Sequence, residues 1–511
     1  MKHTDPAPSS QTLFRQIDWF TTLIPFFCIL ALCVWFVAAP EASDRCIAGI
    51  RAFLGDTLGS YYLIVGLGVF GCSLYMAFSR FGQIRLGSGE KPKYSNFSWG
   101  AMIFTAGLAA DILFYSCCEW MIYALEPRIT ELGSMQDWAS AYPLFHWGPI
   151  PWGFYMVLGT AFGFMIHVRK RNKQKYSESC RALLGSRVDG LAGRVIDLVA
   201  VFALMAGTAT TFSLATPLLA QVVSQLTGIP QSAMLSIGLL MAVCAIYTCS
   251  VCFGMKGIQI SASCCMYLFF ALLGYVFVFG GETRYIVETG ITALGNVAQN
   301  FITLSTWTDS LRTSSFPQNW TIFYWAYWMV WCVATPFFIG AISQGRTIRQ
   351  TVLGGYFWGL SGTFTSFIIL GNFGLGLQMH GKLDVLSAYR ADGDLYGAIV
   401  SILRQLPLSG LVLVLLVLCM VTFYSTSFDS ITLVASSYSY RELGHDQAPD
   451  KRVKLFWAIF LILLPIALLF SENSMASLQS VSIIAAFPVG IIMMLIIASF
   501  FKDAGEYLEG R

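Results

Sequence analysis

The sequence predicts an all-α polytopic membrane protein, and three observations lead to this fold class. First, 56% of the 511 residues are hydrophobic and only 12% are charged, whereas soluble proteins carry about 25% charged residues. Second, the mean hydropathy is +0.65, so the apolar side chains exceed what one soluble core can bury. Third, the apolar residues form long runs without the alternation of a membrane barrel. A cytosolic enzyme, a secreted disulfide scaffold and a disordered chain are therefore excluded.

Twelve of the apolar runs are long enough to span a bilayer, and helices are the natural structure for such runs in lipid. The polar segment 1–16 precedes a first run that is itself a full span, so we expect no cleavable signal peptide. The expected spans lie at about 19–39, 61–79, 98–124, 146–168, 195–222, 231–252, 257–280, 317–342, 352–377, 407–436, 454–471 and 474–501.

The distribution of Lys and Arg predicts that both termini are cytoplasmic. With the N-terminus inside, the inside segments carry 23 basic residues and the outside segments carry eight, as expected when positive charge collects on the cytoplasmic side. Eight of the inside residues lie between Arg169 and Arg194. We interpret that segment as a topology determinant beside anionic lipid rather than as a specific regulator. The expected location is the inner (plasma) membrane, with many passes.

The segment 281–316 is too long for a simple loop between two spans. It mixes polar residues with spaced apolar ones such as Ile291, Val297 and Phe301. This pattern indicates an amphipathic helix that lies outside the membrane.

Four acidic residues fall within the expected spans, where each charge costs about 2.5–3.5 kcal/mol or more. Asp197 follows Arg194 by three residues, so a local ion pair explains it. Glu119 is interpreted as a structural cap for a break in the third span. The other two acids are Asp111 and Asp429.

Asp111 ends a stretch of small residues halfway through a 27-residue span. Small residues allow helices to approach closely, and they also allow a helix to unwind. Two interpretations stay open. Either Asp111 is hydrogen-bonded to a neighbour in a close packing, or its carboxylate lies in a buried cavity and attracts a cation.

The eighth span carries a stripe of indoles at Trp325, Trp328 and Trp331, with Tyr324 and Tyr327 beside them. The spacing of three predicts that the indoles share a helix face. An interfacial belt explains one turn of aromatics but not three turns. Converging indoles suit a quaternary ammonium, which has no N–H to donate, and each ring contributes about 0.5–2 kcal/mol when desolvated.

Adjacent hydroxyls at Thr426 and Ser427 lie in the tenth span. Single hydroxyls often bond back to the carbonyls of their own helix. A pair that faces a broken helix can instead contribute oxygen ligands to Na⁺. The 14 cysteines form no zinc-type spacing, and we interpret them as small buried apolar residues.

These segments resemble the betaine/choline/carnitine transporter family. The resemblance covers about residues 17–505 and is nearest to the carnitine/γ-butyrobetaine exchanger branch. The matching motifs are WTIFYWAYW at 320–328, ISQGRT at 342–347, FHWGPIPW at 145–152, KGI at 256–258 and FKDA at 501–504.

The resemblance implies a LeuT-like fold, in which two leading helices precede two inverted five-helix repeats, and it also implies a homotrimer. The corresponding divisions are a cytoplasmic tail at 1–16, the leading helices and a loop at 17–97, the first repeat at 98–280, the extracytoplasmic helix at 281–316, the second repeat at 317–501 and a cytoplasmic tail at 502–511.

The resemblance also implies where substrate binds. The aromatic box of the family corresponds to Trp328 and Trp331, with Tyr327 and Trp325 alongside, and Asp111 facing them. A second aromatic set, nearer the access path, corresponds to Trp147, Trp152 and Tyr155.

Several positions depart from the family pattern. Only one glycine remains at 107–111, and the Asp at its end matches choline-type members. Gln259 replaces the sodium-mimicking Arg of the exchanger, while Thr426 and Ser427 match sodium-coupled members. Ala341 replaces an Arg of the cytoplasmic gate. The short termini lead us to expect no osmotic regulation.

Together these features predict a secondary active transporter of a trimethylammonium compound, with choline slightly ahead of betaine, carnitine and γ-butyrobetaine. Na⁺-driven symport is expected ahead of sodium-independent exchange, and proton coupling through Asp111 is a third possibility. A membrane enzyme would need a nucleophile or a metal set, and a channel would need a path lined by polar residues. The sequence shows neither. The expected partners are the substrate and the lipid bilayer, without nucleic acid and without a cofactor other than Na⁺ as coupling ion.

Overall fold

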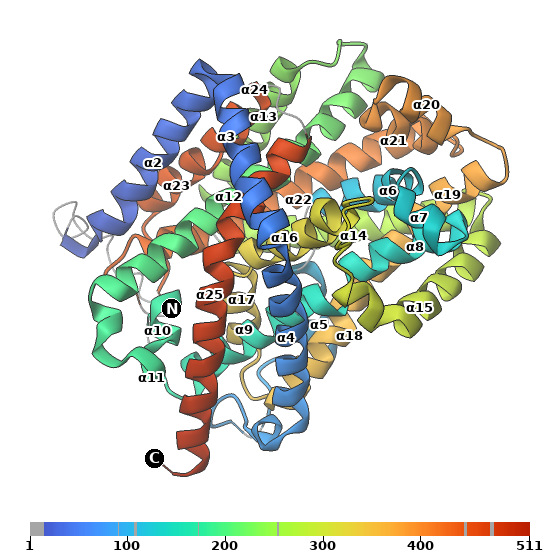
Figure 1. The fold of residues 1–511 in the computed structure, drawn as a ribbon. Helices are drawn as coiled ribbons and strands as arrows, with labels where there is room; N and C mark the ends of the chain where they lie inside the picture. Colours follow the sequence, from blue (N-terminus) through green and yellow to red (C-terminus); the bar gives the residue numbers. More distant parts are fainter. Residues whose placement is uncertain are drawn as a thin grey trace.

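The computed structural model describes residues 15–89, 91–106, 110–171, 173–252, 255–443, 447–470 and 475–510. Over these residues the chain is helical (Figure 1), and it forms no β-strand beyond two isolated β-bridges, Ile17 with Tyr440 and Arg85 with Thr347. The expected all-α class is confirmed for this part of the chain.

Helices fill the first half of the chain almost without interruption. They are α2 (Trp19–Ala38), α3 (Pro40–Arg51), η1 (Ala52–Thr57), α4 (Gly59–Phe78), η2 (Arg80–Gln83), α5 (Asn96–Ala106), α6 (Ala110–Ala124), α7 (Pro127–Leu132), α8 (Met135–His146), α9 (Pro149–His167), α10 (Tyr176–Ser179), α11 (Arg181–Leu184), η3 (Gly185–Asp189), α12 (Leu191–Thr227), α13 (Ala233–Cys252) and α14 (Met255–Phe279).

The second half is built in the same way. Its helices are α15 (Thr283–Thr306), η4 (Pro317–Thr321), α16 (Ile322–Trp331), α17 (Thr335–Ile342), α18 (Ile348–Ser366), η5 (Phe367–Gly371), α19 (Asn372–Met379), α20 (Val385–Asp392), α21 (Leu395–Leu403), α22 (Ser409–Tyr438), α23 (Lys451–Leu461), α24 (Leu463–Phe470) and α25 (Met475–Leu508).

Eight helical stretches in the described part are long and apolar enough to cross a membrane, and two bent pairs raise the number to as many as ten. The third expected span is divided between α5 and α6, with 107–109 outside the described residues. The apolar part of α13, Ala233–Thr248, is shorter than the others. A polytopic membrane protein is therefore supported, while twelve spans and two inverted repeats stay predictions.

The eighth expected span is broken after Trp331. The segments Pro317–Trp331 and Thr335–Ile342 meet at 56°, and residues 332–334 between them form a turn. Pro336 stands at the start of α17, where it has no N–H to donate to a carbonyl in the preceding turn. The break therefore falls directly beside the indole stripe.

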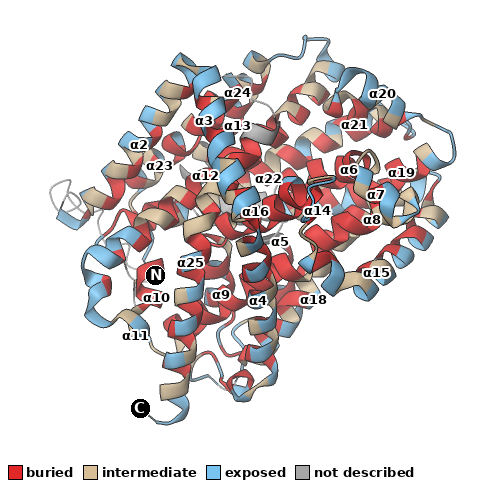
Figure 2. Cartoon of the chain, in the orientation of Figure 1, coloured by how far each residue is buried: buried red, intermediate tan, exposed pale blue. Residues whose placement is uncertain are grey.

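Two helices lie in the middle of the molecule and are covered on every side (Figure 2). Every residue of α9 from Ile150 to Ile166 is buried, as is every residue of α16 from Ile322 to Val330. By contrast, α2 at the edge exposes large apolar side chains such as Phe27 and Val34. A helix that is apolar all round belongs inside a bundle, and here it places aromatic side chains at the centre.

The segment expected to form an amphipathic helix contains α15, which meets α14 at 110° and packs against α8. Its outward face carries Ile291 and Ile302. The loop that follows is organised by Asp309, whose carboxylate accepts hydrogen bonds from the backbone N–H groups of Ser314 and Ser315. Burial would raise the pKa of Asp309, but these hydrogen bonds lower it to about 2.

Candidate functional site

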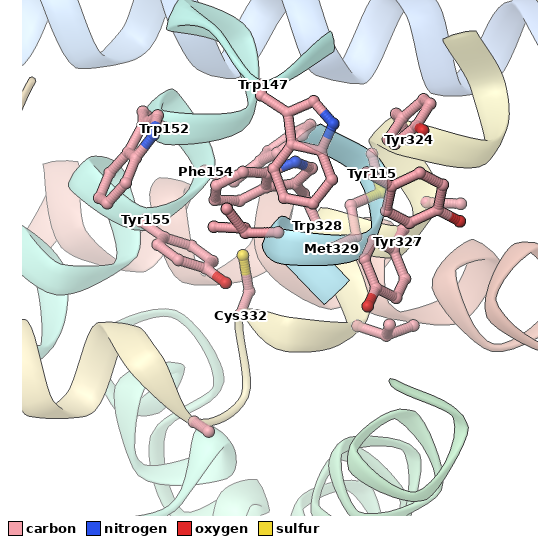
Figure 3. Close-up of a cluster of buried hydrophobic side chains, with 14 of the residues drawn as sticks. Tyr115, Trp147, Trp152, Phe154, Tyr155, Tyr324, Tyr327, Trp328, Met329 and Cys332 are labelled. Atoms are coloured by element: carbon pink, nitrogen blue, oxygen red, sulfur yellow. The ribbon is translucent and has the colours of Figure 1, made fainter. Parts of the chain in front are cut away.

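Four aromatic rings meet at the centre of the molecule, and we call them the ring cluster: Trp147, Trp152, Tyr155 and Trp328 (Figure 3). The ring centroid of Trp328 lies 5.6 Å from Trp147, 5.6 Å from Trp152 and 4.8 Å from Tyr155. All four side chains are buried. Aromatic faces within about 6 Å of one point can hold a cation that has lost its water.

A sharp turn between α8 and α9 delivers three of these rings. Trp147 ends α8, and Gly148 and Pro149 start α9. A Cβ on Gly148 would lie 2.3 Å from the carbonyl oxygen of Leu144, so only glycine fits this turn. The proline preorganises the first turn of the next helix. As a result, Trp147 and Trp152, which lie on either side of the turn, both contact Trp328.

Helix α18 supports the cluster from behind. A Cβ on Gly359 would lie 2.4 Å from the ring of Trp152, so the indole packs directly on the backbone of α18. The hydroxyl of Thr363, one turn later, donates to the carbonyl oxygen of Trp147 at 3.0 Å. Trp152 and Trp147 are therefore both positioned by α18.

A polar arrangement adjoins the cluster on the far side of α16. The hydroxyl of Tyr327 donates to Asp111 Oδ2 at 2.6 Å, and the hydroxyls of Tyr327 and Thr211 form a further hydrogen bond. Asp111 is only 3% exposed, and Oδ1 has no hydrogen-bond partner among the described residues. The structure thus brings Asp111 to Tyr327, which lies on the helix that ends at the break after Trp331.

The other two indoles of the stripe turn away from Trp328. The ring of Trp325 lies 5.2 Å from Phe145 and packs against α4 at Gly66. Trp331 is partly buried at the end of α16, beside Gly207 of α12. A step of three residues turns about 300° around a helix, so the stripe drifts by about 60° per step and spreads over several neighbours.

Residues 20–508 match the family model described as the betaine/carnitine/choline family transporter. The chain belongs to this transporter family. It is therefore a membrane transport protein and not an enzyme, and its family carries quaternary ammonium compounds of the betaine and carnitine type.

Several relatives of known annotation are similar along most of the chain. A glycine betaine transporter of Bacillus subtilis is 31% identical over 484 residues, which cover 93% of this chain and 92% of the relative. A carnitine transporter of Acinetobacter baumannii is 29% identical, covering 82% of this chain and 76% of the relative. A betaine/ectoine transporter of Corynebacterium glutamicum is 27% identical, covering 93% and 76%.

The hydroxyl pair expected to bind the coupling ion of this transporter lies in α22. The hydroxyl of Thr426 donates to the carbonyls of Thr422 and Phe423, one turn back. Ser427 is partly buried. Helix α22 packs against α6. The side chain of Gln259 lies outside the described residues, so its expected role has no structural counterpart here.

Sequence reasoning separated two aromatic sets that the structure joins at Trp328. It also interpreted Glu119 as a helix cap, whereas Glu119 Oε2 accepts a hydrogen bond from the Trp147 indole at 2.8 Å. Glu119 lies on α6 and Trp147 on α8, so no local periodicity links them. The available signal was the cost of a buried acid near the middle of a span.

Proposed function

We propose that this transporter is a secondary active carrier that prefers choline, is driven by Na⁺ and works by alternating access. The ring cluster carries the proposal. A trimethylammonium group has no N–H, so aromatic faces are its best partners, and each contributes about 0.5–2 kcal/mol once water is excluded. Trp328 and the three rings from α8 and α9 are all buried.

The rings of the cluster must move apart before a substrate can bind between them. Its rings touch one another, with Trp152 and Tyr155 centroids 5.6 Å apart and Tyr155 and Trp328 4.8 Å apart. A trimethylammonium group must therefore separate Trp328 from at least one other ring. The turn at 332–334 follows Trp328 within one helical turn, so α16 can shift without disturbing α17. Broken helices are the sites at which such carriers rearrange.

Asp111 favours choline over substrates that carry their own carboxylate. Its Oδ1 atom is buried without a hydrogen-bond partner, and it forms no salt bridge within the described residues. An ionised Asp111 balances the charge of choline. Betaine and carnitine bring a second negative charge, which Asp111 repels unless it is protonated or holds a cation. The names of the relatives point to betaine and carnitine, and these remain the alternative substrates.

Na⁺ coupling is supported by Thr426 and Ser427 in α22, since hydroxyl oxygens are suitable ligands for a hard cation and the helix packs against α6. Helix α6 carries Asp111 to the substrate, so its contact with α22 joins the helix of the ion ligands to a helix of the substrate site. Such a contact between the two helices is a simple way to couple ion and substrate.

Uptake by proteoliposomes tests substrate and coupling together. We expect labelled choline to accumulate when Na⁺ is higher outside than inside, and to stop accumulating when K⁺ replaces Na⁺. Uptake that ignores Na⁺ but rises strongly when choline or carnitine is loaded inside would show exchange instead. Equilibration without accumulation under any gradient would show a passive pore.

A further inference from the structure

A second buried acid on α6 contacts the ring cluster from behind. Glu119 is fully buried and follows Asp111 by eight residues, or about 12 Å along the helix axis. Its Oε2 atom accepts the Trp147 N–H at 2.8 Å, and its Oε1 atom accepts the Tyr123 hydroxyl at 2.6 Å. Each carboxylate oxygen of Glu119 therefore already accepts a hydrogen bond from a side chain of the protein.

A chain of hydrogen bonds fixes Glu119 in this orientation. The Tyr123 hydroxyl also lies 2.6 Å from His146 Nδ1, and His146 Nε2 lies 3.0 Å from the Thr321 hydroxyl. Each hydrogen is used once when Thr321 donates to Nε2, Nδ1–H donates to Tyr123 and Tyr123 donates to Glu119. This chain ties α6 to α8 and to η4, so Glu119 cannot turn away from Trp147 without breaking it.

Trp147 differs from the other indoles around the site in its N–H. The Nε1 atoms of Trp152, Trp325, Trp328 and Trp331 have no hydrogen-bond partner among the described residues. Only the Trp147 N–H within the ring cluster is bonded, and it is bonded to a carboxylate. The hydrogen bond thus orients the indole of Trp147, whose ring lies edge-to-face with that of Trp328, at an interplanar angle of 70°.

We propose that Glu119 is a positioning residue for the cation site, acting through the Trp147 N–H. The bond fixes the plane of the indole against Trp328, and it shifts electron density from the N–H into the ring. An electron-richer face that is held still binds a cation better. This inference rests on the proposed function, because it assumes that the ring cluster binds a quaternary ammonium.

The chain offers a matched control in the pair formed by Glu126 and Trp320. The Trp320 N–H donates to Glu126 Oε1 at 2.7 Å, so the bond has the same chemistry. The Trp320 ring contacts Tyr123, at 5.4 Å between centroids, and it is not a member of the ring cluster. Loss of this bond therefore removes a carboxylate–indole contact without touching the cation site.

Choline binding to the purified full-length protein, measured by calorimetry, tests the inference. We expect Glu119→Gln and Trp147→Phe each to weaken choline about tenfold, as for loss of the buried hydrogen bond that orients the Trp147 ring. The double variant should be no weaker than either single one, because both remove the same contact. Glu126→Gln, which leaves the Trp320 ring against Tyr123, should change choline binding less than about twofold.

A neutral isostere of choline, 3,3-dimethylbutan-1-ol, separates an effect on the cation from a general disturbance. Its inhibition of choline binding should be almost unchanged in Glu119→Gln, because an uncharged group gains little from an electron-rich ring. Equal losses for choline and for the isostere would show that Glu119 is merely structural. Additive losses in the double variant would show that it does not act through Trp147, and either result overturns the inference.

Two further outcomes separate this inference from the proposed function. If the parent protein binds no choline, betaine or carnitine, the proposed function fails and the inference fails with it. If the parent binds choline and Trp147→Phe binds it equally well, only the inference is overturned. Trp147→Phe keeps a ring in the cluster and leaves Glu119 bonded to Tyr123, so it decides the matter even if Glu119→Gln does not fold.

Discussion

The two buried acids of α6 stand in contrasting surroundings. Glu119 has a donor on each carboxylate oxygen, from Trp147 and Tyr123. Asp111 has a donor on Oδ2, from Tyr327, and none among the described residues on Oδ1. Both acids accept a hydrogen bond from an aromatic side chain of the site, but only Asp111 has a carboxylate oxygen without a partner among the described residues.

The two acids show that a carboxylate in a membrane span can either orient neighbouring side chains or keep an oxygen for a ligand. A buried acid is tolerated when its lone pairs are used. Glu119 meets that condition within the protein and acts on its neighbours. Asp111 meets it only in part, and we propose that the charge of the substrate completes it.

Replacing Trp328 with Leu should have the largest effect, because Trp328 contacts every other ring of the cluster. We expect choline binding to weaken about 30-fold, corresponding to about 2 kcal/mol for one desolvated cation–π contact. Calorimetry on the purified protein measures it. Trp325→Leu is the control, since Trp325 lies against Phe145 instead, and a comparable loss there would place the cation site elsewhere on α16.

Asp111→Asn should weaken choline about tenfold, as for loss of one charge at a desolvated site. Betaine should bind equally well or better, because the repulsion of its carboxylate is removed. Competition between the two ligands for the same protein measures the ratio. Glu119→Gln should weaken both ligands by the same factor, since their trimethylammonium groups are identical. A ratio that moves in Glu119→Gln but not in Asp111→Asn would reverse the roles of the two acids.

Features that depend on residues close together in the sequence were predicted, whereas contacts between distant residues were not. Apolar runs and indole spacing are local, so the helical class and the aromatic character of α16 were predicted. Asp111 and Tyr327 were both named as site residues from the sequence, and the structure shows that they form a hydrogen bond. The contact of Trp328 with Trp147 joins residues 181 positions apart along the chain, and no local periodicity predicts it.

The same reasoning explains what was misjudged. The indoles at a spacing of three were expected on one face, but α-helical rotation carries Trp325 towards α4 and Trp331 towards α12. Glu119 was expected to cap a helix, because the sequence does not show that Trp147 and Tyr123 approach it. The position of Glu119 within a span correctly indicated that the residue needs partners. It did not indicate which side chains those partners would be.

Thr426→Val should have a smaller effect, on the ion rather than on the substrate. We expect the Na⁺ concentration for half-maximal choline uptake to rise about fivefold, as for loss of one weak oxygen ligand, or about 1 kcal/mol. Thr422→Val is the matched control, because Thr422 also donates to carbonyls of its own helix, one turn earlier. Equal Na⁺ dependence in both variants would remove Thr426 from the ion site.

The smallest effect is expected for Asp309, in the loop after α15, and it concerns how the stability of the protein depends on pH. Its pKa is lowered in the folded protein to about 2, against about 3.9 in an unfolded chain. Its stabilising effect is therefore complete above about pH 4 and is lost as the pH falls towards 2. Thermal unfolding of Asp309→Asn should differ from the parent by a constant amount between about pH 5 and 8. A difference that changes within that range would contradict the assignment.

The central claim is that Trp328 and the three rings from α8 and α9 hold the charged nitrogen of the substrate. A structure of the protein with bound choline tests it most directly. The account predicts that the quaternary nitrogen lies within about 6 Å of the Trp328 ring centroid and of at least two other rings of the cluster, with Asp111 Oδ1 as the nearest anionic atom. A nitrogen bound away from Trp328, with the four rings still packed on one another, would contradict it.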